Sequence, residues 1–371
     1  MPTPTPTSTP PPTPTIKDDA VPDQWTSTAD ARGIADWIRA QRSILMLTHA
    51  KPDGDALGSS VALARAINIE SGTSGASSKA ECWYAAPMPS WAKTIIGNTK
   101  AKSIEDHQPM PGAFDPAGIL ITDTGSWNQL APFAEFLKPR LDRTTIVDHH
   151  LQGDAEISTR RLIDTTAAAA VQPAAEICCL LLGVDCPSKL PTDIALPLYI
   201  GLATDTGWFK HSNVDGRVMR LAGQLLDAGV NHTSLFAMLY QRDRTARFKL
   251  MARALESMEV IKDKNAAIMT VTLQDFKDTK AGPGETGGFV DLPQSVAAIR
   301  VVALLTEQHD SDGTFTKVSL RSKPDEWEGQ PAVDVNAVCN TLGGGGHARA
   351  AGVKIRKPLE EAKQMLIDAL P

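Results

Sequence analysis

Short apolar segments alternate with amphipathic segments through residues 28–212. The segments SILMLTH, AGILITDT and RTTIVDHH are apolar runs of strand length, and each ends in acidic or imidazole residues. Around them, apolar residues at helical spacing predict helices over Ala29–Arg42, Leu57–Ile69 and Thr192–Ala203, and a further helix with Pro173 in its first turn. Alternation of this kind predicts a mostly parallel sheet with helices on both faces.

The pattern changes after residue 212. Residues 213–260 have a nearly continuous helical pattern, and we expect them to form a helical linker between two domains. From residue 261 to 371 the runs AAIMTVTL, VAAIRVVALLTEQ and FTKVSLRSK predict strands, and a short helix, a glycine run, a strand and a final helix follow. We therefore predict a two-lobed α/β protein with one domain over residues 28–212 and a smaller α/β domain over residues 261–371. Residues 1–22, rich in Pro and Thr, are predicted to be a disordered tail.

Composition narrows the classes of function. The net charge of -6 and the estimated pI of 5.8 argue against wrapping of long double-stranded nucleic acid, which needs a basic face. A small anionic substrate remains compatible, because bound metal ions would supply local positive charge. The five cysteines form no CxxC pair and are expected to be reduced and buried. Without an apolar run of membrane-spanning length or a signal core, the sequence predicts a cytoplasmic protein that does not enter membranes.

Acidic and imidazole residues gather in four short motifs. In chain order they are LTHAKPDGDALGSS, LITDTGSW, TTIVDHHLQGD and GLATDTGWFKHSN, which contain His49, Asp53, Asp55, Asp123, Asp148, His149, His150 and Asp205. Because open α/β sheets place their sites beyond the carboxyl ends of the strands, these residues could converge in one crevice. A single Asp would more simply be a helix cap or a turn residue, but four clusters together favour a metal site.

The residue types indicate which metal chemistry to expect. Carboxylates and neutral imidazoles together suit Mn²⁺. A carboxylate such as Asp123 can bridge two ions, and ions about 3.5–4 Å apart can stabilise both the attacking and the leaving oxygen of a phosphoryl displacement. The sequence therefore predicts a hydrolase with a pair of divalent metals.

A second candidate site lies in the smaller domain. In GGGGHARAAG a run of glycines precedes His347 and Arg349, and backbone N–H groups of such a loop can surround an anion. A flexible linker is the alternative for a glycine run. Arg321, at the end of a predicted strand, could contact phosphate through its guanidinium group or could simply be a solvated strand end. We expect this region to bind phosphate.

At these residues the chain resembles a known family. The motifs HAKPDGDALGS, DTGSW, VDHH and ATDTGWF resemble the signature motifs of the DHH phosphoesterases. The region from GGFVDLPQSVAAIRVVALLTE to GGGGHARAAG resembles the associated C-terminal DHHA1 domain. Chain length and domain pairing are similar to the nanoRNase and pAp-phosphatase subfamily, the NrnA-type proteins. The resemblance implies a catalytic DHH domain, a substrate-binding DHHA1 domain and two Mn²⁺ ions, with Mg²⁺ or Co²⁺ as substitutes.

The resemblance also implies a role for each site residue. One ion would be held by His49, Asp53 and Asp123, and the other by Asp55, Asp123, His149 and Asp205. His150 would face the scissile phosphate, and Asp148 would support the histidines. The non-scissile phosphate or terminal nucleotide would be bound by Gly344, Gly345, Gly346, His347, Arg349 and Arg321.

The implied substrates are oligoribonucleotides of a few residues and 3′-phosphoadenosine 5′-phosphate (pAp). Three alternatives remain open: a cyclic dinucleotide phosphodiesterase, an inorganic pyrophosphatase or polyphosphatase, and a non-catalytic nucleotide-binding regulator. The sequence also leaves a homodimer open.

Overall fold

The structure is a computed structural model that describes residues 24–73, 77–104, 114–323 and 332–371. The predicted disordered tail over residues 1–22 lies outside the described residues. Packing divides the chain between Leu239 and Tyr240 into two units, and each is described here by itself.

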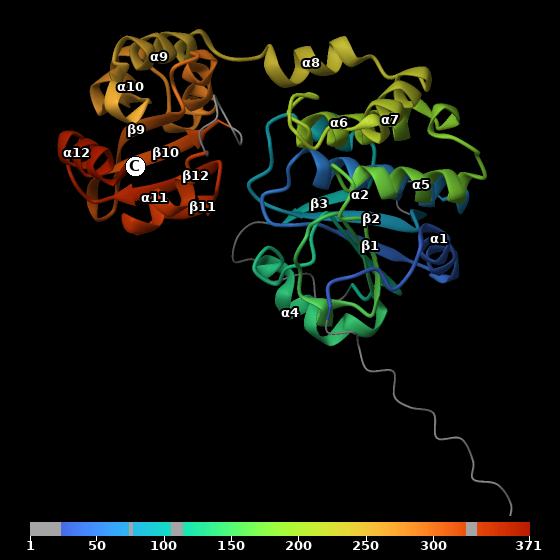
Figure 1. The fold of residues 1–371 in the computed structure, drawn as a ribbon. Coiled ribbons are helices and arrows are strands. Elements are labelled where there is room, and N and C mark those ends of the chain that lie inside the picture. Colours follow the sequence, from blue (N-terminus) through green and yellow to red (C-terminus); the bar gives the residue numbers. More distant parts are fainter. Residues whose placement is uncertain (1–23, 74–76, 105–113, 324–331) are drawn as a thin grey trace, which may run out of the picture. The chain divides into compact units, whose positions relative to one another are not determined.

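The first unit is built on a parallel sheet covered by helices (Figure 1). The strand order is β3-β2-β1-β4-β5-β6, and every strand pair is parallel. The strands are β1 (Ile44–Leu47), β2 (Ala80–Ala85), β3 (Ala101–Ile104), β4 (Gly118–Thr122), β5 (Thr144–Asp148) and β6 (Arg160–Ile163). The three apolar runs of the sequence form the neighbouring strands β1, β4 and β5, which confirms the predicted fold class.

Both faces of this sheet are buried, which explains why its strands are apolar throughout instead of alternating. On β1, Ile44 and Met46 pack into a core with the large helices, whereas Leu45 and Leu47 pack on the opposite face with Phe133. The α-helices of this unit are α1 (Ala31–Ala40), α2 (Gly54–Glu70), α3 (Ala92–Ile96), α4 (Ala134–Leu137), α5 (Val171–Leu182), α6 (Thr192–Asp205), α7 (Gly216–Asp227) and nearly all of α8 (His232–Tyr240).

Helices α2 and α6 touch backbone to backbone. A Cβ atom added at Gly58 in α2 would lie 2.4 Å from the carbonyl oxygen of Pro197 and 3.1 Å from the amide nitrogen of Gly201, both in α6. Asp55 lies one turn before Gly58, and Asp205 lies one turn after Gly201 at the end of α6. The contact between the two glycines therefore helps to fix the distance between two of the predicted site residues.

Residues 213–260 do not form the nearly continuous helix that the sequence predicts. They form α7, α8 (His232–Tyr240) and α9 (Thr245–Glu256). Gly229 follows α7 with a φ of 96°, which a helix cannot accommodate, and Asn231 then accepts a hydrogen bond from the Ser234 N–H at the start of α8. Helix α7 lies in the first unit and α9 in the second.

The second unit contains a mixed sheet in the order β11-β12-β10-β9-β8-β7. Only β8 and β9 pair in parallel among these strands. Helices α11 and α12 pack on one face, and α9 and α10 pack on the other. The bounds are β7 (Glu259–Ile261), β8 (Ala266–Val271), α10 (Leu273–Thr279), β9 (Val301–Asp310), β10 (Gly313–Ser322), α11 (Val335–Thr341), β11 (Gly345–His347), β12 (Ala350–Ile355) and α12 (Leu359–Ala369).

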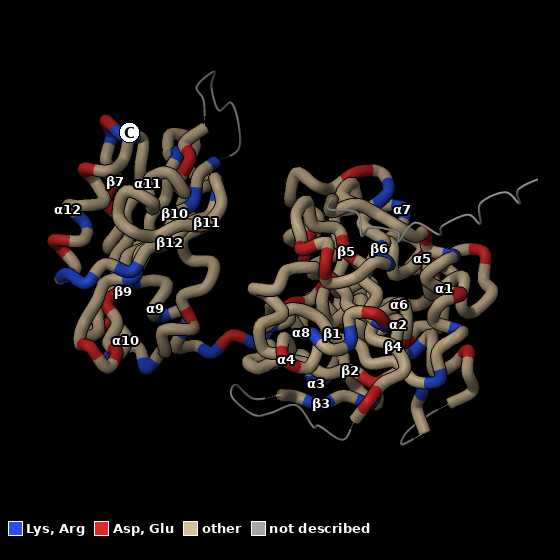
Figure 2. Tube along the Cα trace, turned by 90° about the horizontal axis from the view of Figure 1, so that it is seen from below, with Lys and Arg blue, Asp and Glu red and all other residues tan. Residues whose placement is uncertain are grey.

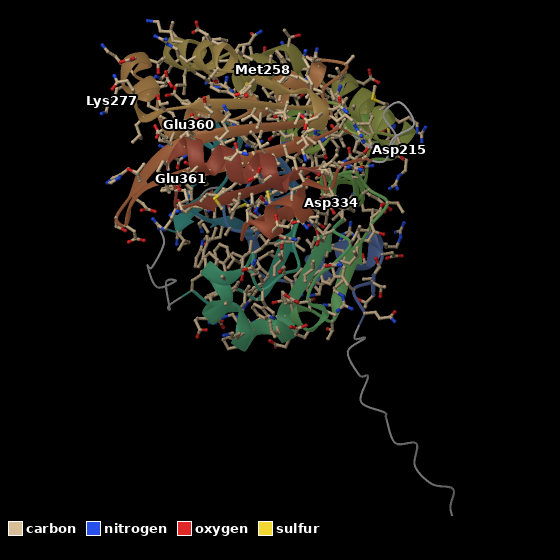
Figure 3. The ribbon with its side chains drawn as sticks, turned by 60° about the vertical axis from the view of Figure 1, so that its left-hand side comes forward. Asp215, Met258, Lys277, Asp334, Glu360 and Glu361 are labelled. Atoms are coloured by element: carbon tan, nitrogen blue, oxygen red, sulfur yellow. The ribbon has the colours of Figure 1, made fainter. Side chains whose placement is uncertain are left out.

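Acidic side chains stabilise the starts of several helices. Asp215 and Asp334, labelled in Figure 3, each accept hydrogen bonds from two backbone N–H groups, at the N-termini of α7 and α11. Glu360 and Glu361, also labelled there, lie in the first turn of α12, where negative charge is favourable.

Charge and thiols are distributed as an ordinary globular chain would have them. Acidic and basic residues are interspersed along both units (Figure 2). All five cysteines are free, and Cys82, Cys178, Cys179 and Cys339 are buried as predicted, whereas Cys186 is half-buried. Among the described helices, none combines the length and apolar character that crossing a membrane requires.

Candidate active site

The first unit brings eight predicted site residues together at one edge of its sheet. His49 follows β1, Asp123 follows β4, and Asp148, His149 and His150 lie at the end of β5. The remaining residues come from the start of α2 and from the end of α6. A cavity of about 430 Å³ at this edge is lined by His49, Ala50, Lys51, Asp53, Asp123, Asn128, Gln129, His149, His150 and Asp205.

Two groups of donor atoms share the Asp123 carboxylate. In the first group, Nε2 of His49 lies 3.5 Å from Oδ2 of Asp123 and 3.7 Å from Oδ1 of Asp53. In the second group, Nε2 of His149 lies 3.4 Å from Oδ1 of Asp123. The two oxygens of Asp123 therefore face different histidines, so this carboxylate could contact two ions at once.

The second group is completed by two further carboxylates. Oδ2 of Asp55 lies 3.8 Å from Nε2 of His149, and Oδ2 of Asp205 lies 3.7 Å from the same nitrogen. Atoms that bind one ion at about 2.1 Å are separated from each other by roughly 3–4 Å. Within each group, the spacing of the donor atoms therefore suits binding to one divalent cation better than direct hydrogen bonds between the side chains.

The backbone orients both histidines toward these carboxylates. Nδ1 of His49 lies 2.9 Å from the carbonyl oxygen of Ala50, and Nδ1 of His149 lies 3.3 Å from that of Ala167. A carbonyl oxygen accepts only from a protonated Nδ1, so in the neutral ring Nε2 carries the free lone pair. This is the tautomer that a metal ion requires at Nε2.

Two helix N-termini hold the acidic ligands in place. Oδ1 of Asp53 accepts hydrogen bonds from the N–H groups of Asp55 and Ala56 and so caps α2. The carboxylate of Asp55 accepts from the N–H groups of Ala170 and Val171 at the start of α5. Asp55 is fully buried, and these N–H groups stabilise its charge.

The backbone at Asp123 is in the left-handed region, with a φ of 62°. This conformation is uncommon for a residue with a side chain, although Asp tolerates it better than most. Strained residues of this kind often occur at functional sites. Here the conformation belongs to the residue whose carboxylate faces both histidines.

Asp148 and His150 form a separate pair beside these groups. Oδ1 of Asp148 lies 2.8 Å from Nδ1 of His150 and accepts the His149 backbone N–H at 2.8 Å. The sequence-based expectation that Asp148 supports both imidazoles therefore needs correction, because the ring of His149 is oriented by the Ala167 carbonyl instead. The side chain of His150 is 45% exposed and faces the cavity.

The site concentrates negative charge, and among the described residues no Lys or Arg forms an ion pair with its carboxylates. Burial alone would lower the pKa of His49 and His149, but the carboxylates beside them outweigh burial and raise each pKa to about 10. Burial and repulsion from Asp123 raise the pKa of Asp205 to about 6, and the same two causes raise that of Asp55. Without metal, the cluster therefore retains protons, which divalent cations would displace.

Sequence reasoning missed three polar residues of the cavity. Lys51, Asn128 and Gln129 line it, and the Ala50 N–H donates to the Gln129 carbonyl oxygen at 2.8 Å. Lys51 lies within the motif HAKPDGDALGS, and Asn128 and Gln129 directly follow DTGSW, so proximity in sequence was the available signal. Lys51 has a φ of 57° and is exposed, and among the described residues its ammonium group has no ion pair.

The predicted substrate-binding residues belong to the second unit, whereas the clustered residues belong to the first. Gly345, Gly346 and His347 form the edge strand β11, so the glycine run is not an open loop. The N–H of Gly344 donates to the Cys339 carbonyl oxygen, and that of Gly346 donates to Oδ1 of Asn336, each at 2.8 Å. These two N–H groups are therefore not available to an anion.

The side chains of this region keep more binding capacity than its backbone. Arg321 and His347 both pair with Ala350, across β10, β12 and β11. Residues in one such row share a face of the sheet. Nε of Arg321 lies 3.3 Å from Oδ1 of Asp291, and Arg349 donates to the Val333 carbonyl oxygen at 3.2 Å.

Comparison with known proteins agrees with this arrangement. Residues 43–202 match the DHH family, N-terminal domain, and residues 263–370 match the DHHA1 domain. The chain belongs to the DHH family. The residues matched by the DHH domain include every residue of the clustered site except Asp205, which lies three positions beyond their end. The residues matched by the DHHA1 domain include Arg321, His347 and Arg349.

Curated relatives extend over most of the chain. A protein of Thermus thermophilus named bifunctional oligoribonuclease and PAP phosphatase NrnA is 28% identical over 343 residues, covering 91% of this chain and 93% of the relative. A protein of the same name from Bacillus subtilis is 23% identical, covering 88% of this chain and 93% of the relative. The crystal structure of an exopolyphosphatase-related protein from Bacteroides fragilis has a TM-score of 0.74 at 20% identity, covering 92% of this chain and 95% of that chain, and supports the fold.

Proposed function

We propose that this protein is a metal-dependent phosphoesterase that hydrolyses short oligoribonucleotides to mononucleotides and pAp to AMP. The observation that carries the proposal is the Asp123 carboxylate, whose two oxygens each face a different imidazole Nε2. The names of the curated relatives support the choice of substrates. The buried free thiols support a reducing, cytoplasmic location.

We propose that the two donor groups hold two Mn²⁺ ions. His49, Asp53 and Asp123 would bind one ion, and Asp55, Asp123, His149 and Asp205 would bind the other. Bound divalent cations would neutralise phosphate charge and lower the pKa of water at the site. The first group offers two carboxylates and a histidine and the second offers three carboxylates and a histidine, which are ligand types that Mn²⁺ accepts.

The residues around the ions would position the phosphate. Asp148 raises the pKa of His150 and orients its ring through Nδ1, so Nε2 of His150 can donate a hydrogen bond to a phosphate oxygen. Lys51, on the same cavity, adds a positive charge for a second oxygen. Both side chains would favour the more negative transition state over the ground state.

We propose that the DHHA1 domain binds the part of the substrate that is not cleaved. Arg321 and His347 share one face of the sheet and can both donate to a phosphate or to a nucleotide. Arg349 and the glycine run, Gly344, Gly345 and Gly346, lie beside them. With two N–H groups of this run already bonded, side chains would contribute most of the affinity.

A substrate panel tests the proposal. The full-length protein is incubated with Mn²⁺ and with RNA dimers to pentamers, pAp, linear and cyclic di-adenylate, or pyrophosphate. We expect mononucleotides from the short RNA and phosphate from pAp, and no turnover after chelation of the metal. Dominant hydrolysis of pyrophosphate or of the cyclic dinucleotide would refute the assigned substrates, and absence of any hydrolysis would refute the enzyme itself.

A further inference from the structure

A segment before the first helix is attached to the edge of the parallel sheet. Oγ of Ser27 donates to the carbonyl oxygen of Ile163 at 2.9 Å and accepts the N–H of the same residue at 2.8 Å. Oγ1 of Thr28 accepts the N–H of Arg161 at 2.8 Å, and the Thr28 N–H donates to the Arg161 carbonyl oxygen at 2.8 Å. Two hydroxyl side chains thus take the place of a pairing strand beside β6.

The guanidinium group of Arg161 also holds this segment through hydrogen bonds. Arg161 is fully buried, and among the described residues it forms no ion pair. Its nitrogens donate to the carbonyl oxygens of Gln24 at 3.2 Å, Thr26 at 3.2 Å and Ala155 at 2.7 Å, and also to that of Ser158. A buried cation is retained only where its donors are satisfied, and here the acceptors come from two distant stretches of chain.

Between these attachments, Trp25 lies against both loops that carry site residues. A Cβ atom at Gly125, two residues after Asp123, would lie 1.7 Å from the Trp25 ring, and one at Gly153, three residues after His150, would lie 2.5 Å from it. The indole Nε1–H donates to the carbonyl oxygen of His150 at 3.0 Å. The loops also touch each other, because the Asp154 N–H donates to the Gly125 carbonyl oxygen at 2.7 Å.

We propose that Trp25 is a positioning residue for His150. The inference rests on the proposed function, in which the imidazole of His150 binds the reacting phosphate. The His150 ring is held by Asp148 at Nδ1, and its backbone is held by the indole of Trp25 at the carbonyl oxygen. Without the indole, the peptide of His150 can rotate, and the ring leaves the phosphate while the metal ligands keep their own supports.

The test compares two tryptophans that differ in what their indole contacts. Trp25→Phe keeps an aromatic ring against the glycines and removes the N–H donor. The matched control is Trp127→Phe, because Nε1 of Trp127 donates at 3.1 Å to the exposed Glu156 and not to a site residue. Both variants, with Mn²⁺, are assayed on an RNA dimer and on bis-p-nitrophenyl phosphate, and unfolding midpoints in urea are measured.

We expect Trp25→Phe to lower kcat about five- to tenfold, the effect of losing one positioning hydrogen bond, with KM and Mn²⁺ affinity unchanged. Trp127→Phe should retain the wild-type kcat. In the metal-free protein, the Cε1–Hε1 NMR signal of His150 should shift or split in Trp25→Phe and stay in place in Trp127→Phe. A benzothienylalanine at position 25, which has the shape of tryptophan without the N–H, should reproduce the loss if the phenylalanine variant is unstable.

The outcomes separate this inference from the proposed function. An unchanged kcat and an unchanged His150 signal in Trp25→Phe or in the benzothienyl variant would overturn the positioning role. Equal losses of kcat in Trp25→Phe and Trp127→Phe would also overturn it, because the effect would then be general loosening. If the wild-type protein hydrolyses no phosphoester, the proposed function fails, and the His150 signal of the metal-free protein still tests the contact.

Discussion

The backbone contact between helices α2 and α6 makes Gly58→Ala a sharp perturbation of the site. The added methyl group would lie 2.4 Å from the Pro197 carbonyl oxygen, about 1 Å closer than ordinary van der Waals contact. Both partners are backbone atoms within helices, so neither can rotate away. Relief requires α2 and α6 to separate by a similar distance, or to slide along each other.

The expected magnitudes follow from this overlap. Overpacking a buried contact lowers the free energy of unfolding by about 1–3 kcal/mol. Alanine loses less conformational entropy than glycine when the helix forms, which offsets roughly 0.5–1 kcal/mol of that loss. Asp55 and Asp205 lie one helical turn from the contact, in helices α2 and α6 respectively. Because a displacement of about 1 Å in a catalytic group can cost about a hundredfold in rate, we expect kcat to fall much more than stability does.

The assay pairs stability with activity on the same samples. Unfolding in urea at 25 °C gives the free energy, and hydrolysis of an RNA dimer with saturating Mn²⁺ gives kcat. Gly223→Ala is the matched control, because Gly223 lies in helix α7 and a Cβ atom there would meet nothing within 4 Å. We expect this control to be as stable as the wild type or more stable by up to about 1 kcal/mol, with full activity.

Two results would refute the reasoning. If Gly58→Ala unfolds at the wild-type urea concentration, the backbones of α2 and α6 are not in tight contact. If its stability falls by the expected amount while kcat stays at the wild-type value, the positions of Asp55 and Asp205 do not depend on that contact. A loss in both variants would show that alanine is tolerated at neither glycine, which would remove the contrast between a packed and an open position.

Three further predictions concern the metal ions and the substrate. Asp123→Asn should abolish binding of both Mn²⁺ ions in calorimetry, and two ions bound with wild-type affinity would disprove the bridging role. Binding at neutral pH should release about two protons, because the pKa values of His49 and His149 are raised to about 10 and only a neutral imidazole binds metal. Affinity should therefore rise with pH up to about 10, and equal heats in buffers of different ionisation enthalpy would contradict this sign. Arg321→Ala should raise KM for pAp about tenfold with kcat unchanged, as for a lost charged hydrogen bond. Arg356→Ala, at the other end of the sheet, should leave KM unchanged. Equal KM values for the two variants would show that Arg321 does not bind the substrate.

Much of the fold followed from local pattern in the sequence. The runs at β1, β4 and β5 are apolar throughout because both faces of the sheet are covered, and this pattern is visible without knowledge of the neighbours. The site residues were found because parallel strands end at a common edge, so motifs far apart in sequence converge there. The break after α7 was missed, since a helical pattern continues on both sides of Gly229 and its positive φ is set by the fold.

The supports of the site were less accessible to sequence reasoning. The Trp25 indole and the His150 carbonyl oxygen are 125 positions apart, and no local motif marks that hydrogen bond. The fully buried Arg161 lies in the short strand RRLI, where a charged residue would be expected at the surface. Its burial depends on carbonyl groups that only the assembled fold presents. Long-range contacts of this kind are decided by tertiary structure alone.

The left-handed backbone of Asp123 has a consequence for how this protein can change over evolution. Glycine at that position would relax the backbone and raise the stability of the fold, by the order of 1 kcal/mol that such conformations cost. Selection for stability alone therefore acts against the aspartate, and only selection for activity retains it. A relative that has lost its catalytic role should lose this carboxylate early. We therefore expect the residue at this position to differ between catalytically active and inactive members of the family.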